Sequence, residues 1–363
     1  MFGAKPHVSR RRRPTTLKSV AAYLGVSTAT VSNAFNRPDQ LSPSRREEIL
    51  AAASALGYDG PSNRGRTLRT GRTNIIGVML SDGLGYSLDD SVASRFLAGI
   101  AEVLDASGHH LLLLTGAGRT DRQGPTLNGV ADGYLIYGSI PEEGTLALLR
   151  HQHQPLVTVD IRLPGLSSVQ INHRAAALTI ARHALAGGAK RPAVVALRMT
   201  LDAPGGRLAR QGHWSQPNAV AIERLAGFDQ ALFEAGFNTA DIPLYNVDGN
   251  TFEAAAPVIE TLLDETSSDL LLCMSDRLAL TALSLAEQRG ISVPDQLWLT
   301  GFDGIAEGQR RRPMLTTIHQ DSHAKGVTAA RMVIGECLEH DVEQPVWLIY
   351  GDTCPPGADV PSS

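Results

Sequence analysis

The stretch LKSVAAYLGVSTATVSNAF, residues Leu17 to Phe35, predicts two short helices joined by a tight turn. Apolar side chains recur at helical spacing in both halves. Gly25 stands where a helix can end in the left-handed conformation, and Ser27 can cap the next helix with its hydroxyl. The outward face of the second helix carries only small or polar side chains: Thr28, Ala29, Thr30, Ser32 and Asn33. This arrangement is typical of a helix-turn-helix that reads DNA.

A third helix follows the pair and completes a small domain over residues 15–59. Ser42 is a favourable N-cap, Pro43 suits the first helical position, and Gly57 can end the helix. Residues 1–14, before this domain, are predicted to form a basic, flexible arm.

Residues 60–73 are rich in Gly, Arg, Ser and Thr, and this composition predicts a linker. The arginines that recur around Leu68 also suit a minor-groove contact. In such a contact, cations bind phosphates and an apolar side chain opens a base step. A linker with no further role is the alternative.

Charge is unevenly distributed along the chain. Residues 1–72 hold 13 Lys and Arg against four Asp and Glu, a net charge of +9, whereas the remainder carries −13 and the whole chain −4. A basic segment on an acidic body indicates that only the N-terminal part meets a polyanion. A solvated basic tail would account for Arg10 to Arg13 but not for the basic residues in the helices that follow.

The cysteine and hydropathy patterns are those of a reduced, cytoplasmic protein. Cys273, Cys337 and Cys354 are far apart, odd in number and outside any metal-binding spacing. The first residues show no secretory pattern, and no apolar run is long enough to span a membrane. We therefore expect cytoplasmic localisation and no membrane partner.

From residue 74 onward, short apolar runs alternate with longer amphipathic ones, which predicts two α/β lobes built on parallel sheets over residues 74–363. The segment from Met199 to Pro217 has no periodicity, so we expect a long loop on the surface or near a ligand site. The predicted strands are Ile75–Leu80, His110–Leu114, Gly133–Tyr137, Leu156–Asp160, Ser168–Ile171, Ala193–Leu197, Leu270–Met274, Trp298–Phe302 and Leu315–His319. The predicted helices are Ser91–Ala106, Glu142–His151, Ala175–Ala186, Ala219–Ala235, Phe252–Asp264, Arg277–Arg289 and Ser322–Leu338.

Signatures of catalysis and of cofactor binding are missing from the sequence. It has no GxxxxGK(S/T), GxSxG or HExxH motif, and Gly116-Ala117-Gly118 lacks the third glycine of a dinucleotide fingerprint. The histidine pairs at 109–110 and at 151 and 153 lack partners at ligand spacing, which favours surface histidines over a metal site. We expect no enzyme activity, no cofactor and no metal.

Residues Thr16 to Asn36 resemble the DNA-binding signature of the LacI/GalR family of bacterial transcription repressors. The resemblance continues in order along nearly the whole chain. Its further motifs are Leu56-Gly57-Tyr58, Leu68-Arg69-Thr70-Gly71-Arg72-Thr73, Ile76-Gly77-Val78, Arg224-Leu225-Ala226-Gly227-Phe228, Met274-Ser275-Asp276 with Leu278-Ala279, Gly301-Phe302-Asp303 and Leu315-Thr316-Thr317-Ile318-His319-Gln320. Each motif alone is weak, but together they are highly specific.

The resemblance implies a domain that reads the major groove as one half of a symmetric dimer. Thr28, Ala29 and Asn33 match positions whose side chains face bases, and Thr30 lies on the same helix face. Asn33 can pair bidentately with an adenine edge, whereas Ala29 can make only apolar contact, for example with a thymine methyl. A simple helix-start role is the alternative for Thr28.

For residues 60–73 the resemblance implies a hinge helix that folds on operator DNA, with Arg66 among its DNA contacts and Leu68 as the minor-groove wedge. The hinge departs from the family pattern in one extra residue between Tyr58 and Leu68 and in Gly65, where Ala is usual. Glycine costs about 1 kcal/mol in a helix interior, so this hinge helix is expected to be weaker without DNA.

For the two lobes the resemblance implies a likeness to periplasmic sugar-binding proteins, with a small effector held between them. Arg224 and Asp276 match the family's effector-contacting residues, and a guanidinium and a carboxylate both bind vicinal hydroxyls. Asp160 matches a third polar position, and Tyr86 could supply an aromatic platform. A structural ion pair or helix cap is the alternative for Arg224 and Asp276, and an ordinary core or surface tyrosine is the alternative for Tyr86.

Two further departures concern caps and the effector. Ser19 stands where the family usually has an acidic residue, so a capping or phosphate-facing detail of the first helix is expected to differ. Gly304 replaces a frequent acidic residue after Asp303, which leaves the identity of the effector open.

The sequence therefore predicts a transcription repressor that binds a near-palindromic operator as a homodimer or tetramer. A sugar, polyol or nucleoside-like effector would shift the lobes and reset the hinge. A pure small-molecule binding or transport protein is an alternative of another class, but it would need a secretion signal and would leave the helix-turn-helix unexplained. An enzyme on this fold is a further alternative that lacks a nucleophile or cofactor motif.

Overall fold

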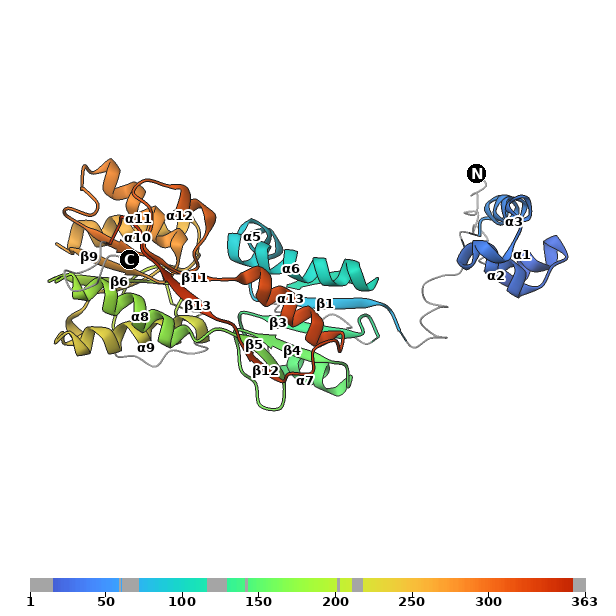
Figure 1. Ribbon diagram of the computed structural model, residues 1–363, viewed down its shortest axis with the longest axis horizontal. Helices are drawn as coiled ribbons and strands as arrows, with labels where there is room; N and C mark the ends of the chain where they lie inside the picture. The colour runs from blue at the N-terminus through green and yellow to red at the C-terminus, as the bar shows by residue number, and fades with distance from the viewer. Residues whose placement is uncertain are drawn as a thin grey trace, which may run out of the picture. The chain divides into compact units, whose positions relative to one another are not determined.

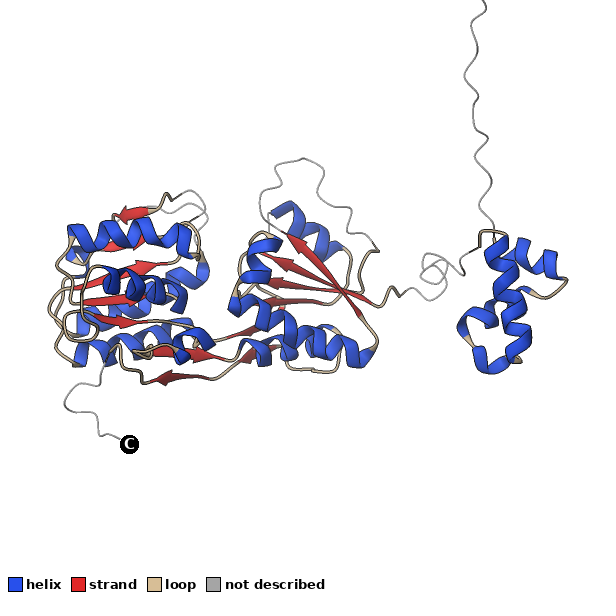
Figure 2. Cartoon of the chain, turned by 90° about the horizontal axis from the view of Figure 1, so that it is seen from above, coloured by secondary structure: helices blue, strands red, loops and turns tan. Residues whose placement is uncertain are grey.

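A computed structural model describes residues 16–58, 60, 72–115, 129–140, 143–200, 203–210 and 218–354 (Figures 1 and 2). The chain divides into two compact units, residues 1–73 and 74–363. Within the described ranges, no helix combines the length and apolar character needed to cross a bilayer. The same ranges contain no group of three or more His, Cys, Asp or Glu side chains placed to hold a metal ion.

The first unit is a small helical domain with a complete apolar core. Its described elements are α1 (Leu17–Leu24), α2 (Thr28–Asn36), the 3₁₀ turn η1 (Pro38–Gln40) and α3 (Pro43–Ala55). The predicted caps are confirmed: Gly25 ends α1 at φ 64°, and the hydroxyls of Ser27 and Ser42 accept the backbone N–H groups at the starts of α2 and α3. The core consists of Val20, Ala21, Val31, Ala34, Ile49, Ala53 and Tyr58.

Ser19 completes a capping box at the start of α1. Its hydroxyl accepts the backbone N–H of Thr16 at 2.8 Å, and the Thr16 hydroxyl accepts the backbone N–H of Ser19 at 3.3 Å. The two residues thereby satisfy N–H groups that a helix start leaves without partners. A short hydroxyl fills the capping role here without the negative charge that an acidic residue would bring.

The second unit begins with an N-terminal lobe built on an all-parallel sheet of order β12-β5-β4-β3-β1-β2 (Figure 1). Its strands are β1 (Ile75–Leu80), β2 (His110–Thr115), β3 (Gly133–Tyr137), β4 (Leu156–Val159), β5 (Ser167–Gln170) and β12 (Asp341–Glu343). Its helices are α5 (Leu84–Asp89), α6 (Ser91–Ser107), α7 (Glu143–His151) and α13 (Ser322–Val333). Helices α6 and α13 bury apolar side chains on one face of the sheet, and α7 does so on the other.

The C-terminal lobe repeats this plan with a sheet of order β10-β9-β6-β8-β7, in which only the edge strand β7 is antiparallel. Its strands are β6 (Pro192–Ala196), β7 (Gly206–Leu208), β8 (Leu244–Asn246), β9 (Leu270–Cys273) and β10 (Trp298–Thr300). Its helices are α8 (His173–Ala186), α9 (Ala219–Glu234), η2 (Thr239–Asp241), α10 (Phe252–Glu265), α11 (Asp276–Gln288) and α12 (Ala306–Arg310). Helices α8 and α9 cover one face of the sheet, and α10 and α11 cover the other (Figure 1).

The chain passes between the lobes three times. It crosses from β5 to α8, from β11 (Thr317–Gln320) to α13, and from β12 to β13 (Val346–Ile349). Strands β11 and β13 pair antiparallel and form a two-stranded ribbon at the junction (Figure 1). Each lobe has its own apolar core. The two lobes are therefore linked by the β11–β13 ribbon and by the side chains beside it.

The predicted α/β alternation is confirmed, and every predicted strand and helix of this unit overlaps an observed one. The expectation of a loop throughout 199–217 is wrong for Gly206–Leu208, because these residues add β7 to the sheet. The last long helix ends at Val333 rather than at Leu338, since Gly335 adopts φ 83°. The elements that periodicity missed are short: α5, α12, β7, β8, β12 and β13.

Candidate DNA interface and interlobe site

The outward face of α2 keeps two of its predicted contact residues open. Thr28 and Ala29 are exposed. Thr30 is half-buried, and its Oγ1 lies 2.8 Å from the Ser27 hydroxyl, so it takes part in capping the helix. Asn33 donates from Nδ2 to Oε1 of Gln40 at 3.0 Å. This bond uses one of the two N–H groups on Nδ2, so Asn33 can contact a base edge while it keeps Gln40.

The remaining predicted DNA contacts, Arg66 and Leu68, lie outside the described residues. Most of the predicted hinge, residues 61–71, lies there with them. Their roles stay predictions from the sequence.

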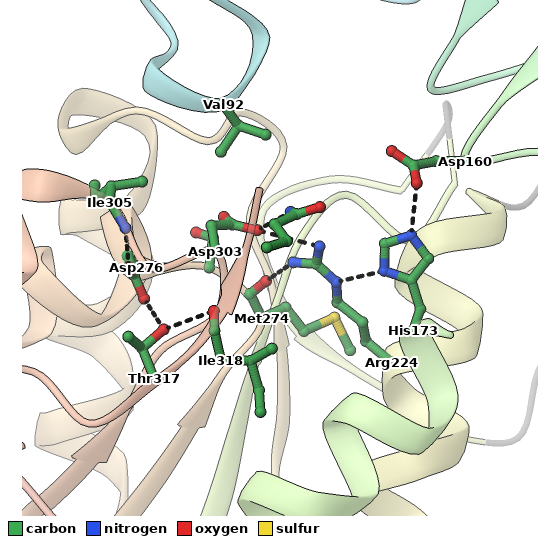
Figure 3. A network of polar contacts seen from close by, with 12 residues as sticks. Val92, Asp160, His173, Arg224, Met274, Asp276, Asp303, Ile305, Thr317 and Ile318 are labelled. Carbon is green, nitrogen blue, oxygen red and sulfur yellow. Dashed lines mark hydrogen bonds and ion pairs between the residues drawn. The ribbon is translucent and has the colours of Figure 1, made fainter. Parts of the chain in front are cut away.

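Arg224, on α9, lies buried at the junction of the two lobes (Figure 3). Its Nε donates to Nδ1 of His173 at 3.3 Å, its Nη2 to Oδ1 of Asp303 at 3.2 Å, and its Nη1 to the carbonyl of Met274. The guanidinium also lies 3.6 Å from the centre of the Phe302 ring, which is a cation–π contact. A guanidinium has five N–H groups, and three of them bond described residues, so two stay available for another acceptor.

His173, the first residue of α8, connects Arg224 to Asp160 (Figure 3). Its Nδ1 accepts from Arg224, and its Nε2 lies 3.3 Å from Oδ1 of Asp160. Burial lowers the pKa of His173 to about 4 against the raising effect of Asp160, and the charge of Arg224 makes a smaller lowering contribution. The imidazole is therefore neutral at pH 7 and carries its proton on Nε2.

Asp160 directly follows β4 and forms the shortest ion pair of the site with Lys325. Both of its carboxylate oxygens lie 2.8 Å from Nζ of Lys325, which is 1% exposed and belongs to α13. The third N–H of this ammonium group donates to Oε1 of Gln320 at 2.8 Å. Burial alone would raise the pKa of Asp160, but Lys325 and His173 hold it well below its usual range.

Gln320 closes these contacts into a ring of six side chains. Its Nε2 donates to Oδ1 of Asp303 at 2.7 Å, the same oxygen that accepts from Arg224. The ring runs through Asp160, Lys325, Gln320, Asp303, Arg224 and His173. Two members belong to the N-terminal lobe, three to the C-terminal lobe and one to the ribbon strand β11. We refer to these six residues as the interlobe ring.

Two members of the interlobe ring hold unusual backbone conformations. Asp160 has φ 59° and Asp303 has φ 118°. A non-glycine residue at such angles costs about 1–3 kcal/mol and persists only where its surroundings hold it. Asp303 is held on both sides, because its N–H donates to Ile318 at 2.8 Å and its carbonyl accepts from Gln320 at 3.2 Å. The strained turns place both carboxylates toward the junction.

Asp276 begins α11 beside the interlobe ring and is fully buried. Its carboxylate accepts the backbone N–H of Ile305 at 2.7 Å and the hydroxyl of Thr317 (Figure 3). Burial, together with the nearby charge of Asp303, raises the pKa of Asp276 to about 7. Burial also raises the pKa of Asp303 to about 6, against the lowering effect of Arg224.

Two glycines near this carboxylate leave no space for a side chain of their own. An added Cβ on Gly301 would overlap Oδ1 of Asp276, and one on Gly304 would overlap the ring and backbone of His319. Gly304 also has φ 70°, which disfavours any side chain. The acidic residue frequent at this position in the family would therefore need a different path for the turn after Asp303.

Tyr86, on α5 of the N-terminal lobe, is half-buried and faces the C-terminal lobe. Burial and the charges of Asp90 and Asp82 raise its pKa, and a hydrogen bond with Asn250 partly opposes that rise. Asn250 in turn accepts the hydroxyl of Ser275 at 2.7 Å, next to Asp276. The structure thus links Tyr86 to Asp276 through two intermediate residues.

All four predicted effector residues therefore lie near the junction, and Asp160 and Arg224 share the interlobe ring. Sequence reasoning missed the ring members that join them, His173, Lys325 and Gln320, and gave Asp303 no site role. Gln320 and Asp303 stand at the ends of two recognised motifs, which was a usable signal. Lys325 sits within a predicted amphipathic helix and His173 lies just before the helix predicted from Ala175, and no local feature distinguishes either residue.

Comparison with known proteins matches both units. Residues 16–60 match the model for bacterial regulatory proteins of the lacI family, and residues 181–354 match that for a periplasmic binding protein-like domain. An HTH-type transcriptional regulator of Mycolicibacterium smegmatis is 35% identical over 339 residues, covering 90% of this chain and 91% of the relative. The HTH-type transcriptional regulator IpsA of Corynebacterium glutamicum is 32% identical over 362 residues, covering 96% and 100%.

A solved structure shows the same architecture. The crystal structure of a LacI family transcriptional regulator from Corynebacterium glutamicum covers 94% of this chain and 100% of its own, with a TM-score of 0.70 and 29% identity. The helix-turn-helix domain, the two parallel-sheet lobes and the full-length relatives agree, and the chain belongs to the LacI family of DNA-binding transcriptional regulators.

Proposed function

We propose that this protein is a repressor whose operator binding is controlled by a small polyhydroxylated effector held at the interlobe site. The observation that carries the proposal is the interlobe ring, which gathers buried charges from both lobes around Arg224. Burying an ion costs several kcal/mol unless partners compensate for it, so such a cluster is seldom a simple stability device. Its carboxylates and guanidinium are the groups that recognise vicinal hydroxyls.

The proposed mechanism is an exchange of hydrogen bonds. Arg224 has two N–H groups to offer, and Asp276 can accept from a hydroxyl in place of Thr317. A ligand that satisfies these groups lets the lobes adopt a second arrangement, whereas one that leaves a buried charge unpaired is rejected. Effector binding then shifts the balance between DNA-competent and incompetent states by its difference in affinity for the two.

Solved structures with the same fold include regulators in complex with small ligands. One is a complex of the transcriptional regulator CelR with cellobiose, 23% identical to this chain, with a TM-score of 0.65. Another is the Lac repressor dimer bound to operator and an anti-inducer, 22% identical, with a TM-score of 0.70. At such identities the likeness shows the fold alone.

On the DNA side, we propose that α2 reads the major groove and that residues 60–73 act as the hinge, with Arg66 at phosphates and Leu68 as the wedge. The open face at Thr28 and Ala29 supports base contact by α2. Two such domains in a homodimer would read two half-sites. Leu84 and Leu88 on α5, which are 37% and 54% exposed, support the existence of a partner surface on the N-terminal lobe. We propose no enzymatic role.

In vitro selection from random duplex DNA by the full-length protein tests the DNA half of the proposal. A near-palindromic consensus is the expected result, because a symmetric dimer reads two half-sites. Selected sequences without symmetry would contradict the dimer, and a pool without enrichment would contradict specific DNA binding. A thermal-shift screen of sugars, polyols and nucleosides on the same protein tests the effector half, since a ligand of the folded state raises its melting temperature.

A further inference from the structure

A side-chain pair connects the outward face of α2 to the turn that follows this helix. Nδ2 of Asn33 donates to Oε1 of Gln40 at 3.0 Å. Asn33 lies on α2 and is half-buried, whereas Gln40 is the last residue of η1 and is exposed. A residue outside α2 therefore contacts the amide that is expected to read a base.

The backbone at both ends of this pair is held in place. The carbonyl of Asn33 accepts the backbone N–H of Arg37 at 2.8 Å, and the backbone N–H of Gln40 donates to the carbonyl of Arg37 at 3.1 Å. Leu41, the next residue along the chain, packs against the apolar core of the domain. Because the two backbones are fixed, the bond to Gln40 restricts the rotation of the Asn33 side chain itself.

The bond also leaves free the amide edge that an adenine needs. A bidentate contact with adenine uses the amide oxygen as acceptor for the N6 amino group and one amide N–H as donor to N7. Nδ2 of Asn33 carries two N–H groups, so one is available for the base and one for Gln40. A reversed Asn33 amide would place its oxygen against Oε1 of Gln40, two acceptors facing each other. Gln40 thereby sets which atoms of Asn33 face outward.

Ala29 cannot provide this support from within the helix. It lies four residues before Asn33, on the same face of α2. Its side chain is a methyl group, which has neither a donor nor an acceptor for the amide. The polar contact that orients Asn33 therefore comes from η1.

We propose that Gln40 is a positioning residue for DNA recognition, which holds the Asn33 amide ready for an adenine and does not itself touch the base. The inference rests on the proposed role of α2 in the major groove and adds the residue that makes Asn33 selective. An amide held in its bound orientation loses less conformational entropy on binding. It also cannot turn to suit a base with the wrong pattern of donors and acceptors, which sharpens the choice of base.

The test is the base preference of the full-length protein at one operator position, measured by fluorescence anisotropy. The position is the adenine of the selected operator at which Asn33→Ala loses its preference. The second operator carries guanine there in both half-sites, and guanine presents two acceptors, O6 and N7, which oppose the oxygen of the Asn33 amide. The wild type should bind the adenine operator about tenfold more tightly or better.

Two variants of Gln40 separate positioning from a general loss of binding. Gln40→Met keeps the length of the side chain but removes the acceptor, so the ratio of the two affinities should fall about threefold or more. Gln40→Glu keeps an acceptor, so the ratio should stay near that of the wild type although the added negative charge weakens binding to both operators. Asn36→Ala is the control, because the amide of Asn36 donates to its own helix at the Ser32 carbonyl, and its ratio should not change.

Three results would overturn the positioning role. One is an unchanged ratio in Gln40→Met, and another is an equal loss in Gln40→Met and Gln40→Glu. The third is an Asn33→Ala variant that keeps every adenine preference of the wild type. Failure of the proposed function itself looks different, because the wild type would then enrich no sequence from random DNA.

Discussion

His173 and Asp160 bridge the two lobes through one hydrogen bond, with Nε2 of the imidazole 3.3 Å from Oδ1 of the carboxylate. The imidazole belongs to the start of α8 in one lobe, and the carboxylate follows β4 in the other. The other ring nitrogen of His173, Nδ1, accepts a hydrogen bond from Arg224. One neutral ring therefore connects a residue proposed to bind the effector with a carboxylate anchored by Lys325.

Replacing His173 with alanine should weaken this connection. The substitution leaves Nε of Arg224 without its acceptor and removes a donor from Asp160, so the free energy of unfolding of the second unit should fall by about 1–3 kcal/mol. Urea unfolding followed by tryptophan fluorescence measures this, because all three tryptophans lie in residues 74–363. The exposed His151→Ala is the control. Equal stability of the two variants would show that the bridge contributes nothing.

The raised pKa of Asp276 predicts a particular pH dependence. Its pKa is about 7 in the folded chain and near 3.8 when unfolded, so the folded state holds the extra proton between these values. The contribution of this carboxyl to stability should therefore be greatest below about pH 4 and be lost as the pH rises from 4 through 7. Asp303, with a pKa of about 6, contributes in the same direction.

Asp276→Asn removes this ionisation while keeping the size of the side chain. Its unfolding free energy should fall less between pH 5 and 8 than that of the wild type, by on the order of 2 kcal/mol. Urea titrations at several pH values provide the comparison, with the exposed Asp105→Asn as control. Parallel pH profiles for the wild type and Asp276→Asn would contradict a buried, proton-binding carboxylate.

Gly304 should tolerate no side chain. Gly304→Ala places a methyl group against His319 at φ 70° and displaces the turn whose Ile305 N–H binds Asp276. A loss of about 2 kcal/mol or more is expected, the sum of backbone strain and overpacking. Gly144→Ala, on an exposed turn of α7 where an added Cβ meets nothing within 4 Å, should be neutral or stabilising. If both variants unfold at the same urea concentration, the close contact of residue 304 with His319 does not affect the free energy of unfolding.

Leu68→Ala should weaken operator binding without changing thermal stability. The residue is proposed to open a base step, and alanine is too short to do so. Fluorescence anisotropy with a selected operator should show at least a tenfold weaker complex, and the affinity of both proteins should fall steeply with salt because basic side chains displace counterions. Equal operator affinities of the wild type and Leu68→Ala would show that Leu68 does not open a base step. An operator affinity that does not change with salt would contradict DNA binding through basic side chains.

The sequence predicted the fold well because its strongest signals are local. The caps at Gly25, Ser27 and Ser42 act within one helical turn, and the apolar strands of parallel sheets form continuous runs that are easy to find. Short edge strands such as β7 and β12 escaped, since three residues cannot display a period and their pairing depends on distant neighbours.

The candidate site was predicted only where a motif marked it. Arg224 and Asp276 stand in recognisable motifs, but the partners that position them come from distant parts of the chain. Lys325 reaches Asp160 across 165 positions, and Arg224 reaches Asp303 across 79. No periodicity reveals a buried lysine in an otherwise amphipathic helix, because its burial is a consequence of the partner carboxylate. For the same reason the sequence could not show that Thr30 and Asn33 have protein partners.

The central claim is that a ligand at Arg224 controls DNA binding, and one coupled measurement tests it most directly. Operator affinity is measured by fluorescence anisotropy for the wild type and for Arg224→Lys, with and without each compound that raises the melting temperature of the wild type. Lysine keeps the positive charge but lacks the planar guanidinium that can donate two parallel hydrogen bonds. At least one compound should change the operator Kd of the wild type about tenfold or more, which is a coupling free energy of about 1.4 kcal/mol. Arg224→Lys should still bind operator, and the same compound should leave the operator Kd of this variant unchanged. An identical change in both proteins, or no change with any stabilising compound, would contradict the account.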